Sequence, residues 1–498
     1  MPTITPSLLY DYLQCPHKVW RDVHGPKQDL VDEDNPFLKL LWERGVRHEK
    51  DTIAAFAHDF VDCSQGTEMQ RIEMTNAALA DRAEYIYQGI LAHGDLFGIP
   101  DLLHWDGAEY YPVEIKSGTA EEGGDDAPGK LKKHYAVQLA LYCEILNRRG
   151  LNSSRKGFVI DITGERFEYD LTRPQGTRTP ETYWEMFLRM RDEVNSLLLD
   201  ETRNEPAMCG ACKMCGWYHS CKEWCEREDD LTRLFYVGRS VRDVIKRDLE
   251  TSRVADLVHI DRDLIVTRKK SDKSFLKGIG AQTIEKMVFR AELMITGSQP
   301  HIHEPHDFPD ASTELFFDIE ADPTQDFIYL HGFWVRDGRG QRFVEFTARD
   351  CSPEAERRVW SEAIDFIRSH DLRDTAIYYY SPYERVSYRR LGRKHPGVIA
   401  ESELDQIFTN ENVIDLYEVV MKKTDWPLGS YGIKAIAQYL NFSWRDETPS
   451  GALSIQWYND YLATRDEKYL TRVLEYNEDD CRATMVVKDY LKQRMTEA

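Results

Sequence analysis

Hydrophobic and polar positions alternate with different periods along the chain, and each change of period predicts a different kind of element. Residues 1–60 have apolar positions at helical spacing, which predicts helices. Residues 70–118 contain strand-like runs, and an Asp106-Gly107 turn signal separates two of them. An acidic, glycine-rich loop follows at residues 119–129, and the sequence LKKHYAVQLALYCEILNRR after it predicts a helix.

The second half of the chain begins with helical patterning and then changes to an α/β pattern. From residue 313, the strand-like runs TELFFDIEAD, FIYLHGFWVRD and QRFVEFTARD precede alternating helices and strands. A stretch rich in Pro, His and Asp before them predicts a linker. We therefore expect a multidomain α/β protein with four segments: residues 1–227 with a cysteine cluster, a helical middle at 228–296, a linker at 297–312 and an α/β domain at 313–498.

Composition supports a globular, multidomain protein. The chain has 498 residues, of which 42% are hydrophobic and 30% charged, and this length exceeds one ordinary core. No apolar run approaches the roughly 18 residues of a membrane span, and we expect no membrane partner. The N-terminus, MPTITPSLLYDYLQCPHKVW, has no basic start and no continuous apolar stretch. We therefore expect no signal peptide and a cytoplasmic protein.

The net charge of −22 has the wrong sign overall for a nucleic-acid-binding protein. Three local basic patches stand against this balance, at residues 130–134, 268–278 and 389–394. A single run of this kind is most often a solvated face. Metal-dependent nuclease sites are themselves acidic, so the charge does not exclude a nuclease.

The stretch EYYPVEIKSG, residues 109–118, places a carboxylate and an ammonium on one face of a strand. Side chains alternate along a strand, so Glu114 and Lys116 share one face. The Asp-Gly turn folds the preceding strand, with Asp101 near its start, against this one. Two carboxylates hold Mg²⁺ or Mn²⁺, and the ammonium stabilises charge on a phosphate. Taken alone, the Glu114–Lys116 pair is better explained by a surface ion pair than by a site.

Further residues in the right order favour a site over a surface ion pair. His48 lies on a predicted helix and adds a candidate metal ligand, while Gln138 and Tyr142 share one helix face and are candidates to contact a nucleic-acid backbone. The series Gly45-x-x-His48, Gly-Ile-Pro-Asp101, Glu114-Ile-Lys116 and Gln138-x-x-x-Tyr142 resembles a PD-(D/E)xK nuclease of the RecB type. The resemblance implies a restriction-endonuclease-like fold in which three residues bind metal and a lysine is catalytic: His48, Asp101 and Glu114, with Lys116.

Five of the ten cysteines fall between Cys209 and Cys225. In a reducing compartment such a cluster indicates a metal site rather than disulfides. Several RecB-type nucleases carry an iron–sulfur cluster on one cysteine before the nuclease motifs and three after them, spaced C-x2-C-x5-C. By this resemblance a [4Fe–4S] cluster is bound by Cys15, Cys212, Cys215 and Cys221. Two alternatives stay open: Cys209 in place of Cys221, and zinc in place of iron.

In the helical middle, FLKGIGAQTIEKM resembles a helix–hairpin–helix. Gly278 and Gly280 flank an apolar residue at the start of a helix, and Lys277 lies beside them. Glycines allow close backbone approach, and a helix N-terminus presents amides to a DNA phosphate. A simple helix-packing turn explains the same pattern.

A second acidic constellation lies in the C-terminal domain. LFFDIEAD places Asp318 and Glu320 on one face of a strand, and LEYNEDDCRAT places Tyr476 and Asp480 on one face of a helix. Glu384 lies between them in the sequence. Several carboxylates on one sheet suit a phosphodiesterase that uses two metal ions.

These residues resemble the DEDD exonucleases of the ribonuclease H-like fold, in the YprB-like branch. The resemblance implies metal binding by Asp318, Glu320, Glu384 and Asp480, with Tyr476 catalytic. Glu384 stands where the motif has Asp. The Tyr-x-x-x-Asp spacing favours Asp480 over Asp479, and we expect Asp415 to cap a helix.

The leading hypothesis is a metal-dependent nuclease, an exonuclease on single-stranded or frayed DNA, in DNA repair, recombination or defence against mobile elements. The resemblances favour DNA over RNA. The alternatives are a ribonuclease that acts through the C-terminal domain alone and a nucleic-acid-binding scaffold with an inactive domain. The sequence has no G-x-x-x-x-G-K-[ST], so duplex DNA requires a frayed end or a separate helicase as partner.

Overall fold

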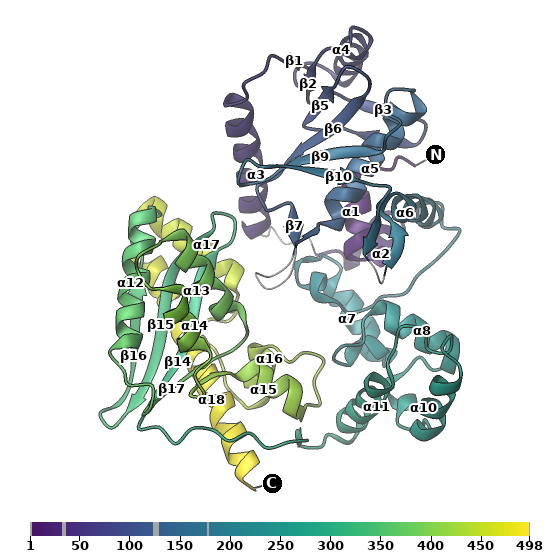
Figure 1. Cartoon of the computed structure of the whole chain (residues 1–498). Helices are drawn as coiled ribbons and strands as arrows, with labels where there is room; N and C mark the ends of the chain where they lie inside the picture. Colours follow the sequence, from purple (N-terminus) through teal and green to yellow (C-terminus); the bar gives the residue numbers. More distant parts are fainter. Residues whose placement is uncertain (1, 32–35, 123–128, 177–178, 498) are drawn as a thin grey trace. The chain divides into compact units, whose positions relative to one another are not determined.

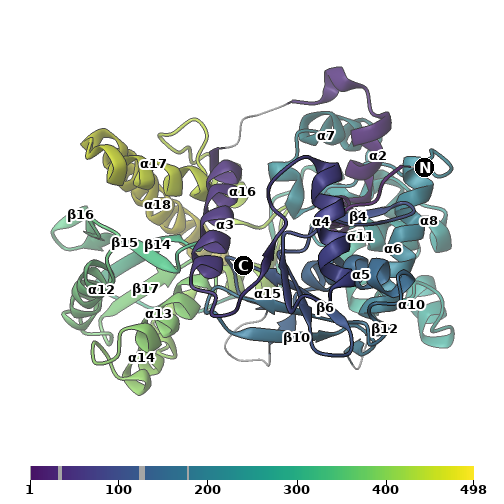
Figure 2. The same ribbon diagram turned by 90° about the horizontal axis from the view of Figure 1, so that it is seen from above.

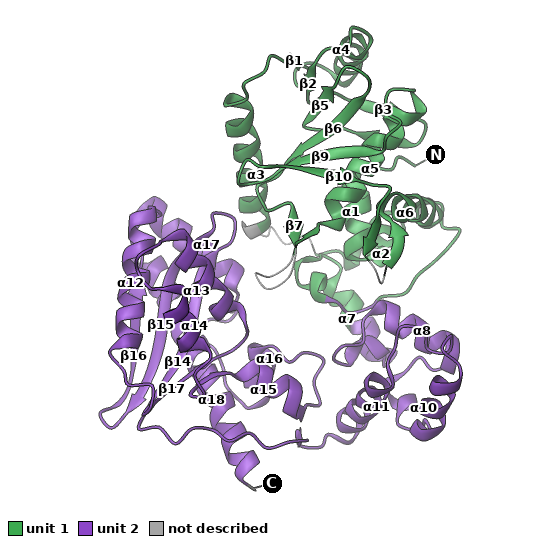
Figure 3. Cartoon of the chain, viewed as in Figure 1, with its two compact units in different colours: residues 1–206, 210–222 green, residues 207–209, 223–498 purple. Residues whose placement is uncertain are grey.

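The computed structural model describes residues 2–31, 36–122, 129–176 and 179–497. The chain divides into two units (Figure 3). The first contains residues 1–206 and 210–222, and the second contains residues 207–209 and 223–498. In the described part of the chain, no helix is both long and apolar enough to cross a membrane.

A six-stranded mixed sheet organises the first unit (Figure 1). Its central hairpin turns at Gly107, whose φ of 101° suits glycine, and pairs Leu102 with Val113, as the Asp-Gly signal predicts. The next strand is parallel to the hairpin's second strand and is reached through helix α5 (Lys133–Arg148). The strand order is β1 (Val61–Asp62), β2 (Tyr85–Tyr87), β5 (Leu102–Trp105), β6 (Tyr110–Ile115), β9 (Lys156–Ile160) and β10 (Arg166–Asp170).

Helices cover both faces of this sheet. Val113 and Ile115 pack with Ile53 on one face. Residues of α5 such as Leu139 and Tyr142 are buried in the main core of the unit. The remaining helices of the unit include α1 (Pro6–Gln14), α2 (Pro16–His24), α3 (Pro36–Ala54), α4 (Glu68–Ala80) and α6 (Tyr183–Leu198).

Helix α4 corrects the strand-like reading of residues 70–118, which holds only from β2 onward. A capping box starts the helix: the Thr67 side chain accepts from the backbone N–H of Gln70, whose side chain bonds back to Thr67. Its buried residues, Thr75, Ala78 and Leu79, recur at helical spacing. The acidic loop beyond β6 forms a hairpin of β7 (Glu121–Glu122) and β8 (Lys130–Leu131), and its residues 123–128 lie outside the described residues.

The second unit begins with a helical segment that has its own hydrophobic core. Buried residues of this core include Ile245, Leu257, Ile265 and Met287. The segment does not end in an unattached linker, because β13 (His301–Ile302) pairs with β19 (Thr424–Asp425) of the α/β domain. The helices are α8 (Arg239–Leu249), α9 (Val254–Leu257), α10 (Arg262–Ser271) and α11 (Ala281–Thr296).

A buried carboxylate attaches the helical segment to the α/β domain. Asp425 has no exposed surface, and its two oxygens accept hydrogen bonds from Arg290 Nε at 2.6 Å and His303 Nε2 at 2.5 Å. A buried carboxylate requires such partners. The Pro- and His-rich stretch is therefore fixed here, although its composition predicted a linker.

A five-stranded sheet with helices on both faces forms the α/β domain (Figure 2). Leu315, Phe317 and Ile319 of β14 share a core with Trp360 and Tyr388 of α12 and α13, so Asp318 and Glu320 point to the opposite face, which α18 covers. The strand order is β16 (Gly340–Thr347), β15 (Phe327–Asp337), β14 (Thr313–Asp322), β17 (Thr375–Tyr379) and β18 (Val413–Asp415). The helices include α12 (Pro353–Arg368), α13 (Tyr383–Lys394), α14 (Glu401–Phe408), α15 (Leu416–Lys423), α16 (Ile433–Tyr439), α17 (Gly451–Thr464) and α18 (Glu467–Glu497).

Candidate functional site

Three carboxylates meet between β14 and α18. Asp318, Glu320 and Asp480 each offer an oxygen, and these oxygens all lie within 4.8 Å of one another. Neighbouring side chains orient two of them: Asn477 donates to Asp318 at 2.6 Å, and Trp444 Nε1 donates to Asp480 at 2.8 Å. The period of two along β14 and the helical period of α18 bring these residues together.

The electrostatics of this group favour a bound cation. Burial and then the charge of Asp480 raise the pKa of Asp318 and of Glu320, the latter to about 8. Burial also raises the pKa of Asp480. Carboxylates crowded in a low dielectric repel one another, and a divalent cation relieves this repulsion. This donor set of hard oxygens suits Mg²⁺ or Mn²⁺.

Glu384 lies beside the three carboxylates but is not one of the mutually close group. It occupies the first turn of α13, is 4% exposed, and burial followed by the charge of Asp415 raises its pKa to about 8. It also raises the pKa of Asp318. Ser381, with a φ of 135°, has its hydroxyl 3.4 Å from the Glu384 carboxylate. The longer side chain at this position is thus buried and directed at the site.

The structure shows Asp415 as the expected helix cap and gives Asp479 an ion-pair partner of its own. Asp415 caps α15 by accepting from the backbone N–H of Tyr417 at 2.9 Å. Asp479 is ion-paired with Arg445 at 2.9 Å, which leaves Asp480 as the carboxylate in the cluster.

A lysine of this site carried no sequence signal. Lys434 of α16 donates to the hydroxyl of Tyr476 at 2.8 Å and to the carbonyl oxygen of Pro449 at 2.7 Å. Its charge lowers the pKa of Asp318, Glu320 and Asp480, opposing their mutual repulsion. One lysine on a mostly apolar helix cannot be recognised from sequence as a partner of Tyr476, 42 residues away.

The raised carboxyl pKa values predict that the metal-free second unit loses stability as the pH rises. A folded-state pKa above the unfolded value means that folding takes up protons, so stability falls between the ordinary pKa of Glu320, 4.5, and about 8. Thermal unfolding in EDTA should therefore show a lower Tm at about pH 8 than at about pH 6. Added Mg²⁺ should remove the difference, and Glu320→Gln should reduce it. Equal Tm values in EDTA would contradict the charge repulsion described above.

The first unit brings Asp101, Glu114 and Lys116 together as the hairpin predicted. Asp101 accepts the backbone N–H of Ile115 at 2.7 Å, and Lys116 donates to the Glu114 carboxylate, which is 1% exposed. Burial and then Glu114 raise the pKa of Asp101. Burial opposes the charge on Lys116, but Glu114 and Asp101 outweigh it and raise the pKa of the ammonium. Lys116 therefore remains protonated beside two carboxyl groups.

Two buried atoms of this site lack a hydrogen-bond partner within the described residues. They are Nε2 of His48, on α3, and Oε1 of Glu114. Unpaired buried polar atoms are costly unless a ligand completes them. The ligand atoms of His48, Asp101 and Glu114 do not all lie within 4.8 Å of one another, so these side chains would have to move closer together to share one cation.

Glu49, which sequence reasoning missed, also belongs to this site. Its carboxylate accepts hydrogen bonds from Gln88 Nε2 at 2.6 Å and from the Tyr87 hydroxyl at 3.0 Å, and its charge raises the pKa of Asp101. Gln88 Nε2 also lies 3.3 Å from Asp101. Consecutive side chains of a helix point in directions about 100° apart, so the position of Glu49 next to His48 did not indicate that both face the same site.

The role expected for Tyr142 requires correction, whereas the one expected for Gln138 stays a prediction. Tyr142 is 1% exposed and donates to the carbonyl oxygen of Ile99, so it cannot contact a nucleic-acid backbone in this conformation. Gln138 donates to Glu114 at 2.9 Å and to the Tyr142 hydroxyl at 3.1 Å. Gln138, which is half-buried, thus orients the Glu114 carboxylate, and the buried Tyr142 hydroxyl accepts a second hydrogen bond from the same amide.

The cysteines expected to bind a cluster lie in the first unit. Cys15 separates α1 from α2, Cys212 lies in the turn η2 (Gly210–Met214), and Cys221 lies on α7 (Tyr218–Arg227). Burial raises the pKa of the Cys221 thiol, Arg21 lowers it, and Cys15 and Cys215 raise it further, so these sulfur atoms interact electrostatically. Cys209 is exposed and belongs to the second unit.

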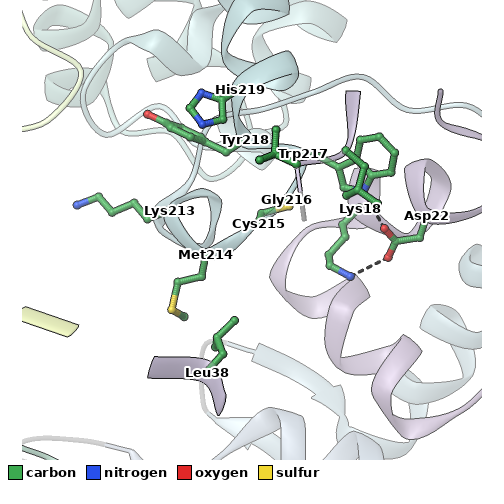
Figure 4. Close-up of a pocket in the computed structure, with 12 residues that line it drawn as sticks. Lys18, Asp22, Leu38, Lys213, Met214, Cys215, Gly216, Trp217, Tyr218 and His219 are labelled. Carbon is green, nitrogen blue, oxygen red and sulfur yellow. Dashed lines mark hydrogen bonds and ion pairs between the residues drawn. The ribbon is translucent and has the colours of Figure 1, made fainter. Parts of the chain in front are cut away.

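A cavity of about 240 Å³ adjoins Cys215 (Figure 4). Its lining includes Leu38, Met214 and Trp217, and Lys18, which is ion-paired with Asp22 at 2.7 Å. Trp217 Nε1 also donates to Asp22 at 2.7 Å. These contacts join the segment after Cys15 to the segment after Cys215.

At the glycine turn of the helical segment, the backbone has no neighbouring side chain packed against it at Gly278. Gly278 has a φ of 86°, Gly280 precedes α11, and a Cβ at Gly278 would meet nothing within 4 Å. Lys277 is exposed. Lys269, in contrast, bonds the carbonyl oxygens of Phe275 and Leu276 and closes the turn.

Comparison with known proteins finds a family model that matches the region around the three-carboxylate site. No curated protein matches the chain. Residues 315–492, however, match the family model of the RNase H superfamily, and this range contains Asp318, Glu320, Glu384 and Asp480. The C-terminal part of the chain is therefore a ribonuclease H-like domain with an acidic, nuclease-type site.

Proposed function

We propose that the protein is a metal-dependent nuclease with two separate active sites. The observation that carries the proposal is the buried group of Asp318, Glu320 and Asp480 inside the RNase H-like match. A divalent cation bound by these oxygens would supply an activated water and stabilise the leaving oxygen.

In the C-terminal site the chain's own groups position the reactants. Tyr476 lies on the face of α18 that carries Asp480, and its hydroxyl is held by Lys434. In the proposed mechanism this hydroxyl would orient an attacking water. The Lys434 ammonium can also offset the charge of the phosphate transition state. Glu384 completes the acidic site from α13.

In the N-terminal site, His48, Asp101 and Glu114 would hold the cation, and Lys116 would stabilise the charge that develops on the scissile phosphate. The support is the contact of Lys116 with Glu114 and the two unpaired buried atoms of His48 and Glu114. Gln138 orients Glu114 directly, and Glu49 is connected to Asp101 through Gln88. Outside this site, in the helical segment of the second unit, the open turn at Gly278 and Gly280, with Lys277, would bind a phosphate backbone.

The substrate we propose is single-stranded or frayed DNA, trimmed from the 3′ end by the C-terminal site, in repair, recombination or defence against mobile elements. Purified protein with Mn²⁺ should degrade end-labelled single-stranded DNA, and EDTA should stop it. Degradation of RNA alone would favour the ribonuclease alternative. Binding without any cleavage would leave only a nucleic-acid-binding scaffold.

We further propose a [4Fe–4S] cluster on Cys15, Cys212, Cys215 and Cys221. The electrostatic interaction of Cys221 with Cys15 and Cys215 and the exposure of Cys209 support this set over one that includes Cys209. A cluster would join the N-terminal helices to the segment after residue 210.

Anaerobically purified protein should be brown, absorb light at about 400 nm and contain iron. Because metal binding is coupled to folding, Cys15→Ala should remove the iron and lower the Tm. Cys351→Ala, at an exposed cysteine, is the matched control and should keep both. Stoichiometric zinc without iron would show that the site is a zinc site.

A further inference from the structure

Three aromatic rings form a connected surface beside the N-terminal site. Tyr10 of α1 meets His134 edge-to-face, with ring centroids 5.6 Å apart and planes at 81°. His134 in turn meets Tyr135, with centroids 4.2 Å apart and planes at 65°. We call Tyr10, His134 and Tyr135 the aromatic platform; all three belong to the first unit.

The platform is partly open to solvent and directly borders the nuclease site. Tyr10 is 47% exposed, so part of its ring can be reached from solvent. The ammonium of Lys116 lies 5.6 Å from the ring centroid of Tyr135, and the Lys116 side chain is itself 21% exposed. The platform therefore runs from the exposed Tyr10 through His134 and Tyr135 to the proposed catalytic Lys116.

A second lysine lies beside the Tyr135 ring, and two more are near it in the sequence. Lys132 lies 5.6 Å from the Tyr135 ring centroid and donates to the hydroxyl of Thr119 at 3.2 Å. Burial lowers the pKa of Lys132, while Glu122 and Asp161 raise it. Lys130 and Lys133 are exposed, and neither forms an ion pair with another residue of the described ranges. Their charges are available to a phosphate backbone.

We propose that the aromatic platform binds unpaired bases of single-stranded nucleic acid and directs that strand to Lys116. Aromatic faces beside lysines are the combination that binds single strands without sequence preference, because each base presents a π-face and each phosphate a charge. Inside a duplex both faces of a base are already stacked. The platform therefore selects an unpaired end. This inference rests on the proposed N-terminal nuclease site and names the form of its substrate.

Binding of oligonucleotides by the full chain in EDTA tests the platform without cleavage. The probe is a single-stranded oligonucleotide with 2-aminopurine at its terminal base, whose fluorescence falls when the base stacks. Tyr10→Ala should weaken binding about fivefold or more and reduce the quenching, because one stacked base is lost. Tyr10→Trp should retain both. Lys133→Glu should weaken binding and reduce its salt dependence.

The matched control is Tyr236→Ala, which removes an aromatic side chain that is 65% exposed in the second unit and should leave binding unchanged. Affinity for a blunt duplex of the same sequence should not respond to Tyr10→Ala. If the platform only packs α1 against α5, Tyr10→Ala lowers the Tm but leaves single-strand affinity and quenching as in the wild type, and the proposal is overturned. Because hydrolysis is not involved, loss of the proposed nuclease function and loss of the platform are separate outcomes.

Discussion

Asp318→Asn is expected to reduce cleavage by the ribonuclease H-like domain by about 10²-fold or more. The substitution keeps the shape of the side chain but removes one of three mutually close anionic oxygens, and loss of one positioned charge at such a site has this size of effect. The amide can still interact with Asn477, so the fold should persist. The measurement is the rate of 3′-end shortening of a 5′-labelled single strand in Mn²⁺, in a Lys116→Ala background that silences the N-terminal site.

The control for this substitution is Asp326→Asn, in the turn between β14 and β15. Asp326 is 44% exposed in its side chain, pairs with Arg390 and has a φ of 50°, a conformation that asparagine accepts. It should leave the rate unchanged, since an exposed ion pair contributes little. A 3′ ladder that survives Asp318→Asn would mean that the three carboxylates are not the catalytic group.

The acidic positions of the C-terminal domain could be predicted because each depends on a local period. Asp318 and Glu320 share a face through the pleat, and Tyr476 and Asp480 through the helix turn. Asp480 could be separated from Asp479 by spacing alone, and the Arg445 ion pair gives the physical reason. Lys434 could not be predicted, because only tertiary packing brings α16 to α18.

In the N-terminal unit, too, the residues placed by local patterns could be predicted, and the contacts made by tertiary packing could not. The Asp-Gly turn fixes the register that brings Asp101 to Ile115, so the carboxylates and Lys116 could be predicted from a hairpin. Gln138 and Tyr142 were correctly placed on one helix face, but their contacts were not, because the burial of that face against the sheet has no local signal. Helix α4 was not predicted because only three of its side chains are buried, which leaves a weak helical pattern after its capping box. Residues 297–312 have the composition of a linker, and the contact between His303 and Asp425 could not be predicted because the two residues are far apart in the sequence.

Lys116→Ala is expected to abolish the N-terminal activity, with a loss of about 10²-fold or more in rate. The Lys116 ammonium is held in the site by Glu114 and Asp101 and is the cation available there for the phosphate. Asp101 and Glu114 remain and can still bind metal, and Gln138 still orients Glu114. The measurement compares cleavage of single-stranded DNA by Lys116→Ala, Asp318→Asn and the double variant.

Lys156→Ala is the matched control, since Lys156 lies in the same unit in a partly exposed pair with Glu168 and should keep full activity. If two sites act, Lys116→Ala leaves a ladder that shortens from the 3′ end, and adding Asp318→Asn erases it. If Lys116→Ala alone abolishes all cleavage, the ribonuclease H-like domain only binds the substrates tested. Glu384 is then the first residue to change, because it lies outside the close carboxylate group and stands where the resembled motif has aspartate. Glu384→Asp in the Lys116→Ala background should restore the ladder if side-chain length at this position is the cause.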